Sequence, residues 1–231
     1  MPLWVGNRKE LPSHAVSIAN RQKAHIPHPA YGLLDGVARA LRGRGKEWIY
    51  FDHSYFKRGW ANGNFRVIRN GFHLTEILDR SDDRLKKFGV EIEPWRKTGR
   101  EIVIIPPSQA QTAMFENPSW LCDIEAKLAR ITDRPVTCKS SKQTPLRDYL
   151  SDAWAVVTFA SVAGVEAALM GVPVFSTDQC PSWPISGSLD NIESPNYADN
   201  RREWASSLCY ASWNWEEMPQ IKWDDYRYEM L

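Results

Sequence analysis

Short apolar runs alternate with amphipathic stretches along the second half of the chain. The runs predict buried strands, and the stretches between them carry apolar residues at helical spacing. Strands that alternate with helices predict βαβ units and a parallel sheet. We expect strands at 101–105, 135–138, 154–158 and 172–175, and helices at 118–131, 146–150, 162–170 and 200–211.

The first half shows the same alternation less regularly. The spacing predicts a helix at 32–41 and strands at 48–51 and 65–68. Residues 79–100 are rich in charge and contain Pro94 and Gly99, which is typical of a connector with one short helix. We therefore expect an α/β domain at 1–98 and a second at 99–231.

Composition places the chain among ordinary globular proteins. Of its 231 residues, 43% are hydrophobic and 25% are charged. No apolar run reaches the length of a membrane span, and the charged first ten residues do not resemble a signal peptide. The four cysteines, at 122, 138, 180 and 209, form no Cys-x-x-Cys pair, which favours reduced thiols and a cytoplasmic location.

The overall charge of +1 conceals an asymmetry between the two halves. Residues 1–100 hold 19 Lys and Arg against 10 Asp and Glu, and residues 101–231 hold 10 against 18. A basic half would attract a polyanion such as nucleic acid. Equally, the two halves could simply attract each other across an interface.

The stretch 155–175 carries the residues that point most directly to chemistry. Thr158 to Ser161 lies at the carboxyl end of a predicted strand, where open α/β sheets bind their ligands. Ser161 is a good helix cap, and the free N–H groups of a helix start attract phosphate. Glu166 follows within two helical turns, where a carboxylate accepts hydrogen bonds from ribose hydroxyls. Taken alone, these residues also fit a capped helix with a solvated surface charge.

The order of these elements adds a resemblance. The chain carries, in order, Ser161, Gly164, Glu166, Gly171, Pro173 and Val174. It thereby resembles GT-B glycosyltransferases, whose C-terminal domain has a Ser/Gly-rich helix start, a Glu and a Gly-x-Pro-Val strand. The resemblance covers roughly residues 100–177 and extends to small tailed-phage glycosyltransferases, including some that modify DNA bases. It implies two Rossmann-like parallel-sheet halves, the N-terminal one reduced because the chain is short.

The resemblance also implies a nucleotide-sugar donor, expected to be a UDP-sugar. The expected donor contacts are Ser108, Gln109, Lys139, Lys142, Ser161, Val162, Ala163 and Glu166. A lysine near the diphosphate would neutralise the leaving group, although both lysines also fit solvated loops and Ser108 fits a turn cap. Because the chain has no Asp-x-Asp sequence, we expect no metal, and we expect no other cofactor.

Catalytic and acceptor-binding residues are expected in the first half. Asp52 and His53 follow the strand at 48–51 and are the leading candidates for a general base. The expected acceptor contacts are His25, His28, Lys57, Arg58, Trp60 and Arg66. Cations interleaved with aromatic residues suit a DNA acceptor, and they also suit a surface hairpin with snorkelling side chains.

Together these features predict a glycosyltransferase that acts on hydroxymethylated bases of phage DNA. Two alternatives stay open. The chain could be a capsule-type polysaccharide sugar transferase or a sugar-nucleotide epimerase, which share the motif order. It could also be a non-catalytic module that uses the same fold to bind a partner.

Overall fold

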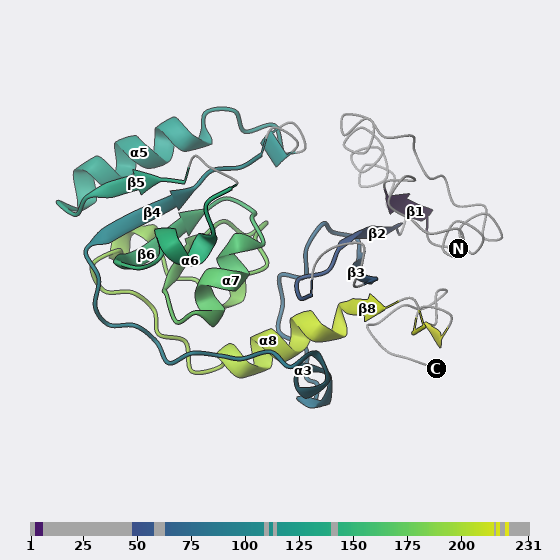
Figure 1. Cartoon of the computed structure of the whole chain (residues 1–231). Coiled ribbons are helices and arrows are strands. Elements are labelled where there is room, and N and C mark those ends of the chain that lie inside the picture. The colour runs from purple at the N-terminus through teal and green to yellow at the C-terminus, as the bar shows by residue number, and fades with distance from the viewer. Residues whose placement is uncertain are drawn as a thin grey trace.

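The structure is a computed structural model of the chain, with two four-stranded sheets joined by helices (Figure 1). It describes residues 3–6, 48–57, 63–108, 111–112, 115–139, 143–214, 216–217 and 220–221. The strands are β1 Leu3–Gly6, β2 Trp48–His53, β3 Asn64–Arg69, β4 Glu101–Ile105, β5 Val136–Cys138, β6 Ala153–Thr158, β7 Val174–Ser176 and β8 Ser212–Asn214. The helices are α3 Asp83–Phe88, α5 Trp120–Ile131, α6 Leu146–Tyr149, α7 Ala163–Leu169 and α8 Arg201–Tyr210, with 3₁₀ turns η2 Trp183–Ile185 and η3 Leu189–Asn191.

One sheet, the parallel sheet, is parallel throughout and has the order β5-β4-β6-β7. From β4 the chain passes through α5 to β5, and then crosses through α6 to β6 on the other side of β4. The direction of winding therefore reverses between β4 and β6. Such a reversal is the topological switch point at which open α/β sheets bind ligands.

Side chains that alternate along β4 fill two separate cores. Ile102 and Ile104 pack on the side of α5, with Leu128. Val103 and Ile105 pack on the opposite side, with the apolar residues of α7 and α8. Helices thus cover both faces of the parallel sheet, which explains why its strands are apolar at successive positions.

The other sheet, the mixed sheet, has the order β1-β2-β3-β8. β1 and β2 are parallel, whereas β2 with β3 and β3 with β8 are antiparallel. The predicted α/β class with a parallel sheet is confirmed for the second half. The first half differs from the expected parallel sheet, because β3 runs antiparallel to both of its neighbours, β2 and β8.

The C-terminal elements α8 and β8 pack against the first half of the chain, and β8 belongs to the mixed sheet. α8 packs beside α3, and β8 pairs with β3 (Figure 1). A buried ion pair joins α3 to the segment that follows β8, because the Arg84 guanidinium on α3 contacts the Glu217 carboxylate at 2.9 Å. Arg84 belongs to the basic half and Glu217 to the acidic half, so part of the charge asymmetry serves internal attraction. α8 and β8, which follow residue 99, thus pack with elements of the first half.

Most elements predicted for residues 79–211 are confirmed, with ends that shift by one or two residues. β2 extends two residues further than predicted, so Asp52 and His53 are part of the strand. α7 begins at Ala163 with Val162 at the cap position, one residue later than predicted. The helix predicted at 32–41 lies outside the described residues.

Gly171 has a geometric reason for its place in the motif between α7 and β7. Its φ is 76°, and a Cβ at this position would lie 2.0 Å from the backbone oxygen of Pro94. Only glycine satisfies both conditions without strain. The connector 89–100 therefore packs directly on the end of α7, and the Arg96 N–H donates to the Gly171 oxygen at 2.7 Å.

Candidate functional site

The switch point lies between the loops that follow β4 and β6. Gln111, in the loop after β4, donates from Nε2 to the backbone oxygen of Ala160, after β6, at 2.8 Å. Within the first loop, the Ser108 N–H donates to Gln111 Oε1 at 2.9 Å, and the Gln111 N–H donates to Ser108 Oγ at 3.2 Å. These bonds hold the two carboxyl-end loops at a fixed separation.

The segment after β7 is tied to the same edge. Thr177 Oγ1 donates to the Phe159 oxygen at 2.7 Å, and the Cys180 thiol lies 3.6 Å from the Ser161 oxygen. A Cβ added to Gly164 would meet Ser182 Oγ at 2.9 Å. The loops after β4, β6 and β7 therefore form one continuous edge.

The first turn of α7 contributes the residues expected to hold a donor. Ser161 is half-buried and its Oγ accepts the Ala163 N–H at 3.2 Å, so it supports the helix start from just before the cap position. Val162 is buried and Ala163 is half-buried. Glu166 is half-buried in the first turn of α7, and Ser161 lies just before that helix begins.

Two other expected donor residues lie at the ends of neighbouring strands. Ser108 is exposed after β4 and, as its bonds to Gln111 show, acts as a turn cap. Lys139 follows β5, where its N–H donates to the Ile104 oxygen at 2.9 Å and its Nζ lies 4.9 Å from the centre of the Tyr149 ring. Gln109 and Lys142 lie outside the described residues.

In the mixed sheet, Asp52 on β2 is the centre of a polar cluster. Its Oδ2 accepts from the Tyr50 hydroxyl at 3.0 Å and from Arg66 Nη2, and its Oδ1 accepts the His53 N–H at 2.7 Å. Arg66 also donates to the His53 oxygen at 2.9 Å. Burial alone would lower the pKa of Arg66, but the Asp52 carboxylate and the Tyr50 and Tyr55 side chains outweigh burial and raise it. The cluster is thus a fixed cation beside a fixed carboxylate.

The placement of Arg66 differs from the expectation that it meets an acceptor. Its side chain is only 5% exposed, and Nε donates to the Phe72 oxygen at 3.1 Å. The guanidinium is therefore used inside the sheet, where it fixes Asp52 and the end of β2. His53 is half-buried and Lys57 is exposed, so both reach the surface. The remaining acceptor candidates, namely His25, His28, Arg58 and Trp60, lie outside the described residues.

A chain of aromatic contacts connects the Asp52 cluster with the switch point. The Tyr50 and Phe72 rings lie 5.1 Å apart, and Phe72 lies 5.5 Å from Phe115 in the segment that follows β4. Phe115 in turn lies 5.2 Å from Phe159 at the end of β6. Edge-to-face contacts of this kind pack the two halves against each other at the candidate edge.

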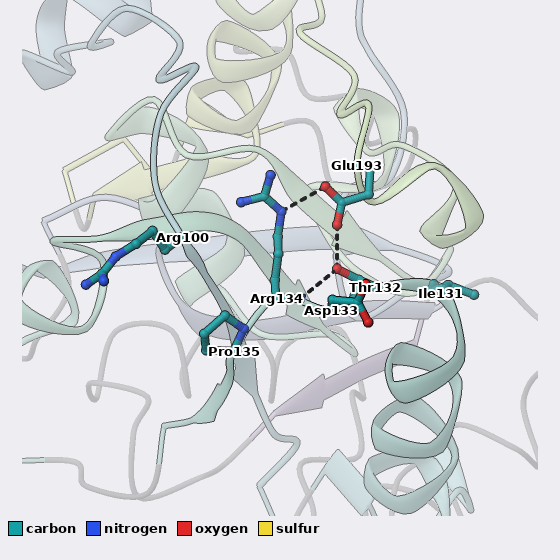
Figure 2. Close-up of a pocket in the computed structure, with 7 residues that line it drawn as sticks. All are labelled: Arg100, Ile131, Thr132, Asp133, Arg134, Pro135 and Glu193. Carbon is teal, nitrogen blue, oxygen red and sulfur yellow. Dashed lines mark hydrogen bonds and ion pairs between the residues drawn. The ribbon is translucent and has the colours of Figure 1, made fainter.

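A shallow pocket lies at the opposite edge of the parallel sheet (Figure 2). Its lining includes Arg100, which precedes β4, and Arg134, which precedes β5. Arg134 Nε donates to the Glu193 carboxylate at 2.9 Å, and its guanidinium lies 3.9 Å from the Trp154 ring centre. Arg134 and Glu193 thus bind each other at the amino ends of the strands, away from the switch point.

Three contributors to these two clusters were not expected from the sequence. Gln111 and Phe115 lie in a segment without a motif. Only the fold reveals that Gln111 joins the segments after β4 and β6, and that Phe115 contacts Phe72, which follows β3 of the other sheet. Tyr50 and Asp52 are two residues apart in β2, so their side chains lie on the same face of the strand. This spacing is the signal that could have placed the Tyr50 hydroxyl beside the Asp52 carboxylate. In the described part of the chain, no helix is long and apolar enough to cross a membrane.

The fold and this edge define a mixed α/β protein with a Rossmann-like, open parallel sheet. No family model matches the chain, and no curated protein matches it. Two solved structures from Thermosulfurimonas dismutans are similar in part. They are KpsC, beta Kdo 2,7 transferase, at 10% identity and TM-score 0.47 over 89% of this chain and 90% of that chain, and KpsC, beta Kdo 2,4 transferase, at 12% identity and TM-score 0.43 over 90% of each. Similarity at this level assigns neither an activity nor site residues to this chain.

Proposed function

We propose that the protein is a glycosyltransferase that moves a sugar from a nucleotide-sugar donor, a UDP-sugar in the first instance, to an acceptor hydroxyl. The observation that supports this most is the edge at the switch point. There Gln111 fixes the loop after β4 to Ala160, and the α7 start presents Ser161 and Glu166 beside it. Ligand sites of open α/β sheets form at such an edge.

The proposed donor site uses groups at three strand ends. The helix start at Ser161, Val162 and Ala163 and the ammonium of Lys139 would hold the diphosphate, and the Glu166 carboxylate would accept hydrogen bonds from the ribose hydroxyls. This assignment supplies positive charge to the leaving group without a metal ion. Ser108 would contribute chiefly by holding the loop after β4.

The proposed reaction is a single displacement at the sugar. The acceptor hydroxyl oxygen forms a bond to the anomeric carbon while the bond from that carbon to the diphosphate oxygen breaks. The nucleoside diphosphate leaves with the electron pair, and the hydroxyl proton passes to a base. His53 is the proposed base because it is half-buried at the end of β2, while Asp52 is held in its ion pair with Arg66.

For the acceptor we retain hydroxymethylated bases in DNA. Support comes from the excess of cations in residues 1–100, which hold 19 Lys and Arg against 10 Asp and Glu. The burial of Arg66 removes one of the cations first counted for this role, and Lys57 stays available at the surface. A polyanionic acceptor requires an affinity that falls steeply as salt increases.

The experiment is mass spectrometry of hydroxymethylated DNA after incubation with the protein and a panel of nucleotide sugars. A mass increase of one hexose or other sugar per modified base is the expected result. Sugar transfer to an oligosaccharide but not to DNA would retain the glycosyltransferase and replace the acceptor by a carbohydrate.

Two further outcomes would reject the proposal. Conversion of the donor into an isomer without transfer would identify an epimerase. A protein whose melting temperature is unchanged by every donor would instead be a non-catalytic module, because a ligand at 100 times its Kd adds about 2.7 kcal/mol to the free energy of unfolding.

A further inference from the structure

Trp183 differs from the other tryptophans whose side chains the structure describes. Its side chain is 46% exposed, whereas Trp204 and Trp213 are fully buried. The half-buried tryptophans use their indole nitrogens, as Trp154 does in donating to the Ile192 oxygen at 2.8 Å. An exposed indole offers a large, flat apolar face that a flat ligand can cover.

The backbone that carries Trp183 is fixed on both sides. Its N–H donates to the Cys180 oxygen at 3.0 Å, and its own oxygen accepts the Ser186 N–H at 3.0 Å. Two residues later, Ile185 is 1% exposed and anchors the turn η2 in the core. The ring is therefore presented from a rigid base, which lowers the entropy lost when a flat ligand binds it.

The residues just before Trp183 contact the proposed donor edge directly. Ser182 Oγ lies under the first turn of α7, 2.9 Å from where a Cβ on Gly164 would stand. The Cys180 thiol lies 3.6 Å from the Ser161 oxygen. Trp183 is thus placed at the rim of the segment that holds Ser161 and Glu166.

We propose that Trp183 is the stacking platform for the nucleobase of the donor. This proposal rests on the proposed function, because it extends the same donor site by one subsite. In the strand order, β6 adjoins the switch point and β7 lies beyond it, so η2 follows the next strand outward. The base of a nucleotide with its phosphates at residues 161–163 and its ribose at Glu166 is proposed to lie on this side of the edge, against Trp183.

Stacking accepts any base, because every base has a flat π-face. The subsite would therefore add affinity for nucleotides over bare diphosphate without selecting strongly among bases. The selective contacts would have to come from other groups.

The test compares the binding of UDP and of inorganic pyrophosphate by calorimetry, with CDP, ADP, GDP and CMP as further nucleotides. The variants are Trp183→Ala and Trp183→Phe. The matched control is Val136→Ala, which shortens the other exposed large apolar side chain, 41% exposed, at the amino end of β5. We expect Trp183→Ala to weaken UDP by roughly tenfold or more, Trp183→Phe to weaken it less, and Val136→Ala to leave it unchanged.

Pyrophosphate distinguishes stacking from a general disturbance of the edge. We expect Trp183→Ala to bind pyrophosphate as the wild type does. Unchanged UDP affinity in Trp183→Ala would overturn the stacking role, as would an equal loss of UDP and pyrophosphate. A wild-type protein that binds none of the nucleotides would overturn the proposed function together with this subsite, whereas the first two results would leave the proposed function intact.

Discussion

Asp52 and Arg66 form an ion pair that is buried on one side and open on the other. The Arg66 side chain is 5% exposed and that of Asp52 is 28% exposed. The guanidinium is thus enclosed by the sheet, and the carboxylate lies between it and the surface. The pair fixes the carboxyl end of β2, where the proposed base His53 also lies.

The first prediction concerns this pair. Asp52→Asn would leave the buried Arg66 guanidinium without its counter-charge, so we expect a loss of about 1–3 kcal/mol in the free energy of unfolding. The estimate is below that for a fully buried pair because water reaches Asp52. Urea denaturation of the variant and the wild type would measure the difference.

The matched control is Asp82→Asn. Asp82 pairs with Lys86 and Arg202, whose side chains are 69% and 56% exposed, and the pair lies in solvent. We expect a much smaller change for Asp82→Asn. Equal losses in the two variants would show that burial of Arg66 does not determine the stability of this region.

The second prediction concerns pH and Glu217. Burial alone would raise the pKa of Glu217, but hydrogen bonds from Arg84 and Lys87 lower it below the ordinary 4.5. A lowered folded-state pKa stabilises the protein above the unfolded-state pKa, and this stabilisation is lost as pH falls through the folded-state value. At pH 7, Glu217→Gln should therefore cost about 3 kcal/mol, and the difference from the wild type should shrink below about pH 4.5.

Glu216→Gln serves as the control for this measurement. Glu216 is exposed and adjacent in the chain, so we expect Glu216→Gln to change the free energy of unfolding little at pH 7. A Glu217→Gln difference that stayed constant from pH 7 to pH 3.5 would contradict the assigned ion pair with Arg84.

The third prediction concerns the cysteines, all four of which are free thiols. Cys122 is exposed, whereas Cys180 and Cys209 are buried, and burial raises the pKa of both buried thiols. Because the thiolate is the reactive form, Cys122 should react first with iodoacetamide and the buried pair only after unfolding. Peptide mass spectrometry over time would show the order, and early labelling of Cys180 would contradict its burial at the sheet edge.

The sequence was informative where local pattern and tertiary environment agree. The strand at 101–105 and the helix ending at Ile131 were predictable, because apolar runs and helical spacing coincide with the two cores they fill. Gly171 could be recognised as part of a motif. Its reason, a positive φ and the close approach of Pro94, required the structure.

The rest could not be predicted because it depends on partners distant in the chain. The aromatic, basic segment around Arg66 suggested an exposed cation. Asp52 lies opposite Arg66 on the neighbouring strand, and only this pairing shows that the Arg66 guanidinium is internal. β8 is three residues long, and its pairing with β3 depends on the path of α8. Gln111 likewise acquires its role from Ala160, which lies 49 residues further along the chain.

The central claim is that the carboxyl edge of the parallel sheet holds a nucleotide donor. Calorimetry of UDP binding by the wild type, Glu166→Ala and Arg100→Ala tests it most directly. Arg100 is the control because its side chain is 81% exposed at the pocket of the opposite edge. We predict that Glu166→Ala weakens UDP by about tenfold or more, through the loss of charge-assisted hydrogen bonds to the ribose, and that Arg100→Ala binds as the wild type does. Wild-type affinity in Glu166→Ala, or a loss confined to Arg100→Ala, would contradict the account.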